Sequence, residues 1–298
     1  MSVTVRVPAK VNVQLAVGAA RPDGFHDLAN VFLAVSLFDE VTATAADELT
    51  VTCAGPDADQ VPLDRTNLAA RAAGILAERA KIAPAVHLHI AKSIPVAGGM
   101  AGGSADGAAA LLACDALWGL DTPRAELLDI CAELGSDVPF SLVGGAALGT
   151  GRGELLTPVE AGAFHWVFAV ADGGLSTPAV FREFDRLTAG TRIPEPEASP
   201  ALLAALASGD PDALAPALAN GLQAAALSLR PALAKTLAAG TEAGALAALV
   251  SGSGPTTAFL VRDEEAAAKV AAALEASGTC RATRVAASPA PGATILPS

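Results

Sequence analysis

The feature that most constrains the fold is a glycine-rich run from Pro95 to Leu112, PVAGGMAGGSADGAAALL. It follows a short apolar segment typical of a β-strand and leads directly into an alanine-rich segment typical of a helix. Glycine tolerates positive φ angles and lets the backbone approach a ligand closely. The helix start adds unpaired N–H groups and the positive end of the helix dipole. The run therefore favours a phosphate-binding loop between a strand and a helix.

Neither of the two common phosphate-binding motifs is present in this loop. The chain has no GxxxxGK[ST] sequence, and no GxGxxG sequence stands at a predicted strand end. A flexible strand-to-helix connection is the plain structural alternative. The loop alone leaves both interpretations open.

The composition indicates an acidic globular protein. Of the 298 residues, 52% are hydrophobic and 17% are charged, which excludes a disordered chain and allows two domains with a substantial core. The net charge is −12 and lysine and arginine form no cluster, so we expect no nucleic-acid partner. The N-terminus lacks the apolar stretch of a signal peptide, and no uncharged apolar run reaches the roughly 18 residues of a membrane span. We expect a cytoplasmic protein that binds no membrane.

Cysteine and histidine give no sign of a metal site. The four cysteines are scattered without a CxxC pair, at Cys53, Cys114, Cys131 and Cys280. Disulfides and a zinc site are therefore not expected. His87 and His89 share one face of a predicted strand but have no third ligand in the sequence, so a structural role is favoured over metal binding.

Apolar periodicity and turn residues predict an α+β protein with two domains, residues 1–156 and 157–298. In the first half we expect strands at Val3–Val17, Leu28–Phe38, Leu49–Cys53, Val86–Ile90 and Phe140–Leu148, and helices at Thr66–Ala80, Ser104–Trp118 and Pro123–Leu134. In the second half we expect strands at His165–Ala171, Leu246–Val250, Ala258–Val261 and Arg281–Ala286, and helices at Pro178–Leu187, in the alanine-rich region up to about Ala239, and at Glu264–Ser277. Thr66 and Thr122 are the expected N-caps, and the tail after Ala287 is expected to fray.

Three further segments carry residues with possible chemistry. In PAKVN, Lys10 and Asn12 share one strand face, where a buried ammonium needs an anionic partner and an edge lysine needs none. In LGSDVPF, Asp137 follows a helix that ends at Gly135, so it is either a functional carboxylate or an ordinary turn residue. The turn SGSGPTT, which starts at Ser251, is either a plain hairpin or a second wall of a phosphate site.

The order of PAKVN, PVAGGMAGGSA, LGSDVPF and SGSGPTT resembles that of the GHMP small-molecule kinases, over Val5 to about Val285. Within that superfamily, PAKVNVQLAVGAARPDGFHDL followed by LGSDVPF is similar to the members whose acceptor alcohol carries a cytidine diphosphate group. The resemblance implies phosphoryl transfer from ATP to the 2-hydroxyl of 4-(cytidine 5'-diphospho)-2-C-methyl-D-erythritol, in the non-mevalonate isoprenoid pathway. Another GHMP kinase, such as a homoserine or mevalonate kinase, is the alternative. The implied fold joins an N-terminal domain like ribosomal protein S5 domain 2 to a ferredoxin-like C-terminal domain.

The resemblance also implies roles for individual residues. Asp137 would be the general base, and Lys10 beside it would keep it ionised and stabilise the transferring phosphoryl group. ATP, used as its Mg²⁺ complex, would be bound by Asn67, Lys92, Pro95, Val96, Ala97, Gly98, Gly99, Met100, Ala101, Gly102, Gly103, Ser104 and Ala105. The acceptor would be bound by Asn12, Phe25, His26, Phe181, Ser251, Gly252, Ser253 and Gly254. The metal ligands are left unassigned.

Two positions depart from the pattern of the resembled kinases. Phe25 stands where tyrosine is usual, which preserves a stacking face and loses a hydroxyl. Asp106 stands where asparagine is frequent. It is either a carboxylate favoured by the helix dipole or a metal contact, and the first interpretation is preferred.

Overall fold

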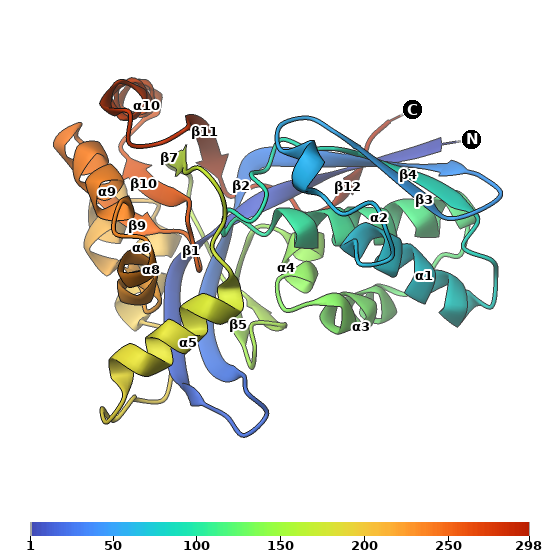
Figure 1. Ribbon diagram of the computed structural model, residues 1–298, viewed down its shortest axis with the longest axis horizontal. Coiled ribbons are helices and arrows are strands. Elements are labelled where there is room, and N and C mark those ends of the chain that lie inside the picture. Colours follow the sequence, from blue (N-terminus) through green and yellow to red (C-terminus); the bar gives the residue numbers. More distant parts are fainter. Residues whose placement is uncertain (1, 298) are drawn as a thin grey trace.

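The fold is built on a long antiparallel hairpin that runs from one half of the molecule to the other (Figure 1). The computed structural model describes residues 2–297; β1 spans Ser2–Ala20 and β2 spans His26–Ala45. Both strands are longer than the predicted segments, mainly at their C-terminal ends, where alanine extends β1 and alternating valine and alanine extend β2. Around this hairpin the described residues form a sheet of eight strands with the central order β12-β1-β2-β4-β3.

The remaining strands of the first sheet extend it outward from the hairpin. They are β3 (Thr50–Ala54), β4 (Val86–Ala91), β5 (Ala146–Thr150), β6 (Leu155–Pro158), β8 (Ala219–Asn220) and β12 (Thr294–Ile295). Strand β5 pairs with β2 and carries β6, while β8 pairs with β1. Two of the eight strands, β8 and β12, come from the second half of the chain.

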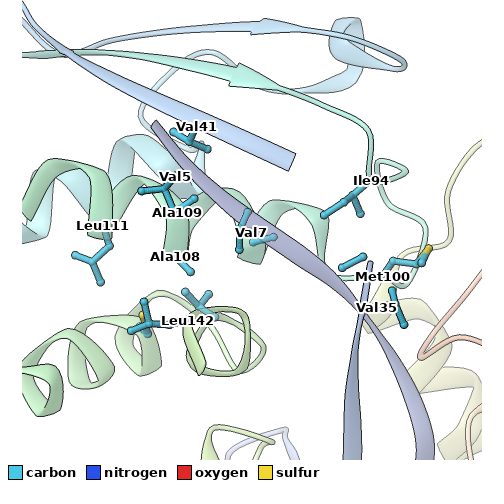
Figure 2. Packing of buried hydrophobic residues seen from close by; sticks show 14 of the residues in the cluster. Val5, Val7, Val35, Val41, Ile94, Met100, Ala108, Ala109, Leu111 and Leu142 are labelled. Atoms are coloured by element: carbon cyan, nitrogen blue, oxygen red, sulfur yellow. The ribbon is translucent and has the colours of Figure 1, made fainter. Parts of the chain in front are cut away.

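Four helices and one 3₁₀ turn belong to the first half. The helices are α1 (Leu68–Ala80), α2 (Gly102–Trp118), α3 (Arg124–Leu134) and α4 (Val138–Val143), and the turn is η1 (Ala58–Gln60). Helix α2 is the central one, since it packs on both β1 and β2 and buries most of its alanines. Figure 2 shows Ala108 and Ala109 of α2 beside Val5 and Val7 of β1. The small side chains allow this helix to lie close to the sheet, which fixes the position of its N-terminus.

The second half forms its own antiparallel sheet. Its strands are β7 (Phe164–Val170), β9 (Ala247–Val250), β10 (Thr257–Val261) and β11 (Ala282–Ser288), in the order β11-β7-β10-β9. The helical segments are α5 (Thr177–Thr188), α6 (Pro200–Ser208), α7 (Pro211–Leu214), η2 (Ala215–Ala217), α8 (Gln223–Leu229), α9 (Leu233–Glu242) and α10 (Glu264–Ser277). The predicted α+β class is confirmed. The boundary between residues 156 and 157 stays a prediction.

The segment Phe140–Leu148 is not a single strand as predicted. Residues Val138–Val143 form helix α4, and the strand begins only at Ala146. Proline near the start of α4 favours a helix, and Gly144 at φ +67° ends it. A short apolar run such as this one does not distinguish a buried helix from a strand.

Two helix starts also differ from the prediction. Asn67, and not Thr66, caps α1, because its Oδ1 accepts the N–H of Ala69. Helix α3 begins at Arg124 with Pro123 before it, and Thr122 donates its N–H to Asp115. The cap at Asn67 matters for function, because it engages a side chain to which the resemblance assigned a role in ATP binding.

The C-terminal tail is not frayed as predicted. Ala290 donates its backbone N–H to the carbonyl of Ala34, its own carbonyl accepts the N–H of Gly145, and Ala293 donates its N–H to the carbonyl of Ser141. Beyond these bonds, β12 pairs with β1, so both ends of the chain lie at the same end of the molecule (Figure 1). The tail is held by backbone pairing, which its proline- and alanine-rich sequence does not reveal. In residues 2–297 no helix has the length and apolarity needed to cross a membrane.

The tail contact predicts an effect of Gly292 on stability. A β-carbon at Gly292 would lie 2.4 Å from the carbonyl oxygen of Leu142, a backbone atom that cannot move aside cheaply. We expect Gly292→Ala to lower the free energy of unfolding by about 1–3 kcal/mol, measured by urea denaturation.

Gly74→Ala is the matched control. Gly74 lies within helix α1 and has open space around its α-carbon. Its replacement by alanine should raise stability by roughly 0.5–1 kcal/mol. Equal effects at the two glycines would contradict the packing of the tail.

Candidate active site

A cleft of ≈ 670 Å³ lies between the two halves of the molecule. Its walls come from β1, β2, the glycine-rich loop, α5 and the turn after β9. Most of the residues assigned to a site from the sequence line it: Lys10, Asn12, Phe25, His26, Ala97, Gly98, Gly99, Ala101, Gly102, Gly103, Ser104, Asp137, Phe181, Gly252, Ser253 and Gly254. The structure thus brings four separate motifs to one cleft.

Lys10 occupies the centre of the cleft floor. Its Nζ lies 3.5 Å from Oδ2 of Asp137, the partner expected from the sequence. The ammonium also donates hydrogen bonds to Oδ1 of Asn12 at 2.7 Å and to the carbonyl of Gly99 at 3.1 Å. Asn12 is held in turn by a 2.7 Å hydrogen bond from its Nδ2 to Oδ1 of Asn30. Lys10 is only 5% exposed, and these acceptors offset the cost of burying its charge.

Asp137 lines the cleft near Lys10, and helix α4 fixes its position. The sequence predicts no helix directly after this residue, whereas Asp137 directly precedes α4 as its N-cap residue. Its side chain nevertheless makes no capping hydrogen bond and stays partly exposed. The carboxylate is therefore available to a ligand while its backbone is fixed by the helix.

The glycine-rich loop lies against the second glycine turn. Gly99 has φ +79°, and a β-carbon there would be 2.2 Å from the carbonyl oxygen of Ser251. The Ser251 hydroxyl donates a hydrogen bond to the Gly99 carbonyl at 3.1 Å. Only glycine permits this approach at position 99. The turn SGSGPTT is therefore a wall of the same cleft in addition to being a connection between β9 and β10.

Helix α2 begins in the cleft without a side-chain cap. Ala101, its N-cap residue, has no side-chain acceptor to offer, and Gly102, Gly103 and Ser104 of the first turn line the cleft. The first N–H groups of a helix need acceptors from outside the helix. An anion such as a phosphate suits this position, and the helix dipole favours it.

Not every residue of the loop faces the cleft. The side chains of Met100 and Ala105 are fully buried in the core, where Figure 2 shows Met100 near Ile94 and Val35. Pro95 is buried and Val96 half-buried at the loop entry, outside the cleft lining. Ser251 is also buried and contributes through the loop contact described above. These residues shape the cleft from behind.

Asn67 and Lys92 lie away from the cleft lining. Both functional atoms of Asn67 are engaged, since Oδ1 caps α1 and Nδ2 donates to the carbonyl of Pro62 at 2.7 Å. Lys92 is buried beneath the loop, where it forms ion pairs with Asp39 and Asp106. The roles of both residues toward ATP stay predictions.

Asp106 has a different environment from either of the two expected. Helix α2 begins at Gly102, two residues earlier than predicted, which places Asp106 beyond the first turn. Its Oδ2 accepts a hydrogen bond from Lys92 at 2.8 Å. Burial raises the pKa of Asp106 to about 7, because desolvation opposes the charged form more strongly than Lys92 favours it. Among residues 2–297, no group of three or more histidine, cysteine or acidic side chains could hold a metal ion.

The outer end of the cleft contains an aromatic group. The ring of Phe181 stacks on that of His26, with a centroid distance of 4.9 Å and an interplanar angle of 29°. The Nε2 atom of His26 is 2.9 Å from Oδ1 of Asp185. Phe25 is 49% exposed, and the Arg152 guanidinium lies over its ring at 5.2 Å. The three aromatic residues predicted from the sequence thus all line the cleft, and two of them, His26 and Phe181, stack on each other.

Several residues in and around the cleft were not predicted from the sequence. Asp185 lies one helical turn after Phe181 on α5, so the i, i+4 spacing could have indicated it. Arg152 stands between two glycines in GTGRGE, a composition typical of an exposed functional turn. Asp39 gave no comparable signal, because it lies with Glu40 inside a strand and belongs to none of the motifs.

Comparison with known proteins shows the class to which this fold and cleft belong. Residues 67–145 match the GHMP kinases N terminal domain, and residues 202–280 match the GHMP kinases C terminal domain. A homoserine kinase from Cytophaga hutchinsonii has a similar structure, with a TM-score of 0.75 over 99% of this chain and 97% of that chain. Its sequence identity of 21% supports the shared fold alone.

Closer similarity exists to one group of these kinases. The 4-diphosphocytidyl-2-C-methyl-D-erythritol kinase of Streptomyces avermitilis is 77% identical over 99% of this chain and 100% of its own length. A crystal structure of a 4-(cytidine 5'-diphospho)-2C-methyl-D-erythritol kinase gives a TM-score of 0.79 at 31% identity, covering 96% of this chain and 99% of that chain. The chain belongs to the GHMP kinase family and, within it, to the 4-diphosphocytidyl-2-C-methyl-D-erythritol kinases. The predicted family and its two-domain fold are confirmed.

The raised pKa of Asp106 predicts a pH dependence of stability. An unfolded aspartate titrates near 3.8 and the folded Asp106 near 7, so the folded chain keeps a proton that the unfolded chain releases. The contribution of Asp106 to the free energy of unfolding therefore falls as the pH rises from about 4 to about 7, and is constant above this window.

The asparagine of the Asp106→Asn variant cannot titrate. We therefore expect the free energy of unfolding of this variant, relative to that of the unchanged protein, to increase as the pH rises through the same window. Urea denaturation of both proteins at several values between about pH 5 and pH 8 measures this difference. A difference that is the same at every pH would contradict the raised pKa.

Proposed function

We propose that this protein transfers the γ-phosphoryl group of ATP to the 2-hydroxyl of 4-(cytidine 5'-diphospho)-2-C-methyl-D-erythritol. The products are the 2-phosphate and ADP, and the reaction belongs to non-mevalonate isoprenoid biosynthesis. The single observation that carries the proposal is the Lys10–Asp137 pair, 3.5 Å apart, facing the N-terminus of α2 across one cleft. The 77% identity to a kinase named for this substrate supports the choice of acceptor.

Asp137 acts as the general base in this proposal. The acceptor hydroxyl oxygen forms a bond to the γ-phosphorus while the bond from that phosphorus to the β,γ-bridging oxygen breaks. The hydroxyl proton passes to the Asp137 carboxylate, and ADP leaves with the bridging oxygen. A carboxylate is a weak base, but phosphoryl transfer depends mainly on positioning and on stabilisation of charge. The backbone of Asp137 is fixed by α4, and its side chain makes no capping bond, so the carboxylate is free to orient the hydroxyl.

Lys10 supplies fixed positive charge at the point of transfer. Its ammonium is held by Asn12 and the Gly99 carbonyl, so it need not reorganise as charge develops on the phosphoryl oxygens. Its second effect is on Asp137, because the ammonium at 3.5 Å attracts the carboxylate and holds it at the point of transfer. One lysine thus serves both the base and the phosphoryl group.

ATP is placed with its phosphates on the glycine-rich loop and the start of α2. The free N–H groups of the first helical turn and the dipole behind them suit a polyphosphate. Ser104 and Asp137 offer oxygen donors in the cleft, which is the donor type that Mg²⁺ prefers, so the residues fit a metal carried mainly by the triphosphate. The ion, when bound, would neutralise phosphate charge.

The acceptor is placed with its cytosine at the aromatic end of the cleft. Phe25 and Phe181 offer ring faces for a pyrimidine, and His26 offers polar atoms for its edge. Asp185 fixes one nitrogen of His26 and so decides which nitrogen is left for a ligand. We expect the reaction to take place in the cytoplasm.

A panel of acceptor alcohols tests the proposed substrate. Purified protein is incubated with ATP and either the CDP-linked methylerythritol, homoserine or mevalonate, and the phosphorylated product is identified by mass spectrometry. We expect phosphorylation of the CDP-linked alcohol alone. Equal use of homoserine or mevalonate would overturn the assignment and leave a less specific GHMP kinase.

The base role of Asp137 predicts a loss of turnover without a loss of ATP binding. Asp137→Asn keeps the size of the side chain and removes the proton acceptor, so kcat should fall by a factor on the order of 10²–10⁴. The dissociation constant of ATP, measured by calorimetry, should stay near that of the unchanged protein. Near-normal turnover of this variant would exclude Asp137 as the base.

The cytosine position predicts a separable loss of acceptor affinity. Free CMP should compete with the acceptor and not with ATP, and Phe181→Ala should weaken CMP binding by about 1–3 kcal/mol through loss of a stacking face. Leu187→Ala, an exposed apolar residue on the same helix, is the matched control and should leave CMP binding unchanged. Competition of CMP against ATP in inhibition kinetics would place cytosine elsewhere.

A further inference from the structure

Three charged side chains are buried together beneath the glycine-rich loop. The Nζ atom of Lys92 donates hydrogen bonds to Oδ2 of Asp39 at 2.5 Å and to Oδ2 of Asp106 at 2.8 Å. Asp39, Lys92 and Asp106 are 0%, 3% and 3% exposed, so none of them meets a ligand in the cleft directly. Their function must act through the backbone around them.

These side chains connect the two ends of the loop. On the entry side, Oδ1 of Asp39 accepts the backbone N–H groups of Ser93 at 2.6 Å and Ile94 at 2.9 Å, directly before Pro95. On the exit side, Asp106 belongs to α2, just after the loop. Lys92 lies between them, and a β-carbon at Gly102 would be 3.1 Å from its Nζ. The ammonium therefore lies directly below the first residue of α2. Asp39, on β2, holds the entry of the loop by its own hydrogen bonds and the exit of the loop through Lys92 and Asp106.

The loop needs such support because its backbone is strained. Ala97 and Ala101 have φ angles of 51° and 62°, in the left-handed region that residues other than glycine rarely adopt. Such conformations cost of order 1 kcal/mol or more each and persist only when surrounding contacts enforce them. Both alanines line the cleft. The contacts that fix the loop ends thus help to fix its phosphate-facing part.

We propose that Asp39, Lys92 and Asp106 form a clasp that holds the glycine-rich loop in its ATP-binding conformation, with Asp39 and Asp106 as positioning residues. This inference rests on the proposed use of ATP. It assigns Lys92 an indirect role toward the nucleotide, through the loop and the start of α2. The clasp also explains why residue 102 is a glycine, because a side chain at this position would press on the Lys92 ammonium.

The buried charges of the clasp do not balance, so the clasp is not optimised for stability. One ammonium faces two carboxylates, and the Oδ1 atom of Asp106 is buried without a hydrogen-bond partner. A buried polar atom left unpaired reduces stability, and a buried ion pair is often no better than apolar packing. The surplus carboxylate is therefore a stability cost retained at a functional loop, and Asp106→Ala leaves the balanced pair of Lys92 and Asp39.

The test measures ATP and CMP binding by calorimetry in three variants. Asp106→Ala breaks the connection from Lys92 to α2 and should raise the dissociation constant of ATP by on the order of 10-fold to 100-fold, the cost of a displaced loop. Asp106→Asn keeps an acceptor for Lys92 and should restore most of the affinity. Asp115→Ala is the matched control, because Asp115 is a largely buried aspartate on the same helix but near its far end. It should leave ATP binding unchanged, and all three variants should bind CMP normally.

The outcomes separate the clasp from the proposed reaction. Unchanged ATP affinity in Asp106→Ala, while the unaltered protein binds ATP, would overturn the clasp and leave the proposed function standing. Equal losses in Asp106→Ala and Asp115→Ala would reduce the effect to general destabilisation of α2 and also overturn it. Failure of the unaltered protein to bind ATP would overturn the proposed function, and the role of the clasp with it. Urea denaturation of each variant confirms that folded protein is being compared.

Discussion

The burial of the Lys10 ammonium is the interaction on which the arrangement of the cleft depends. A charge with 5% exposure must be surrounded by acceptors, and here they come from distant parts of the chain. Asn12 lies on the same strand, Gly99 in the glycine-rich loop and Asp137 at the start of α4. The Gly99 carbonyl also accepts the Ser251 hydroxyl from the second half of the chain. Satisfying one lysine therefore draws the loop, the acidic turn and the second glycine turn to a single point.

Much of this cleft could be predicted from the sequence, because the residues that line it belong to short motifs. PAKVN, the glycine-rich run, LGSDVPF and SGSGPTT each contain residues whose type and spacing restrict their roles. The predicted approach of Lys10 and Asp137 is present, and the strands and the helix of the loop unit lie close to their expected positions. Local pattern was sufficient within each motif, whereas the approach of Lys10 to Asp137, which lie far apart in the chain, followed from the resemblance to the GHMP kinases.

The errors arose where long-range contacts decide the structure. The tail is ordered because its backbone pairs with Ala34, Gly145 and β1, none of which is visible from its own composition. Helix α4 occupies the start of a predicted strand because a short, mostly apolar segment suits either element, and burial against α2 and β1 decides between them. Asp39 lies more than 50 residues from Lys92 along the chain, so its role becomes apparent only in the folded protein. Sequence separation, and not chemical ambiguity, hid that side chain.

The acidic surface and the anionic ligands proposed for the cleft are compatible because the charge is distributed unevenly. The chain carries a net charge of −12, whereas the cleft lining contains three basic residues, Lys10, Arg152 and Arg182, and only two acidic ones, Asp137 and Asp185. The N-terminus of α2 adds partial positive charge at the loop. One of the two carboxylates, Asp185, is already paired with His26. Asp137 is thus the acidic group left beside the phosphates, and the like-charge repulsion that it would exert is reduced by Lys10 at 3.5 Å. In the proposed reaction the lysine offsets the repulsion between the base and the triphosphate, so the lysine and the aspartate act as one unit.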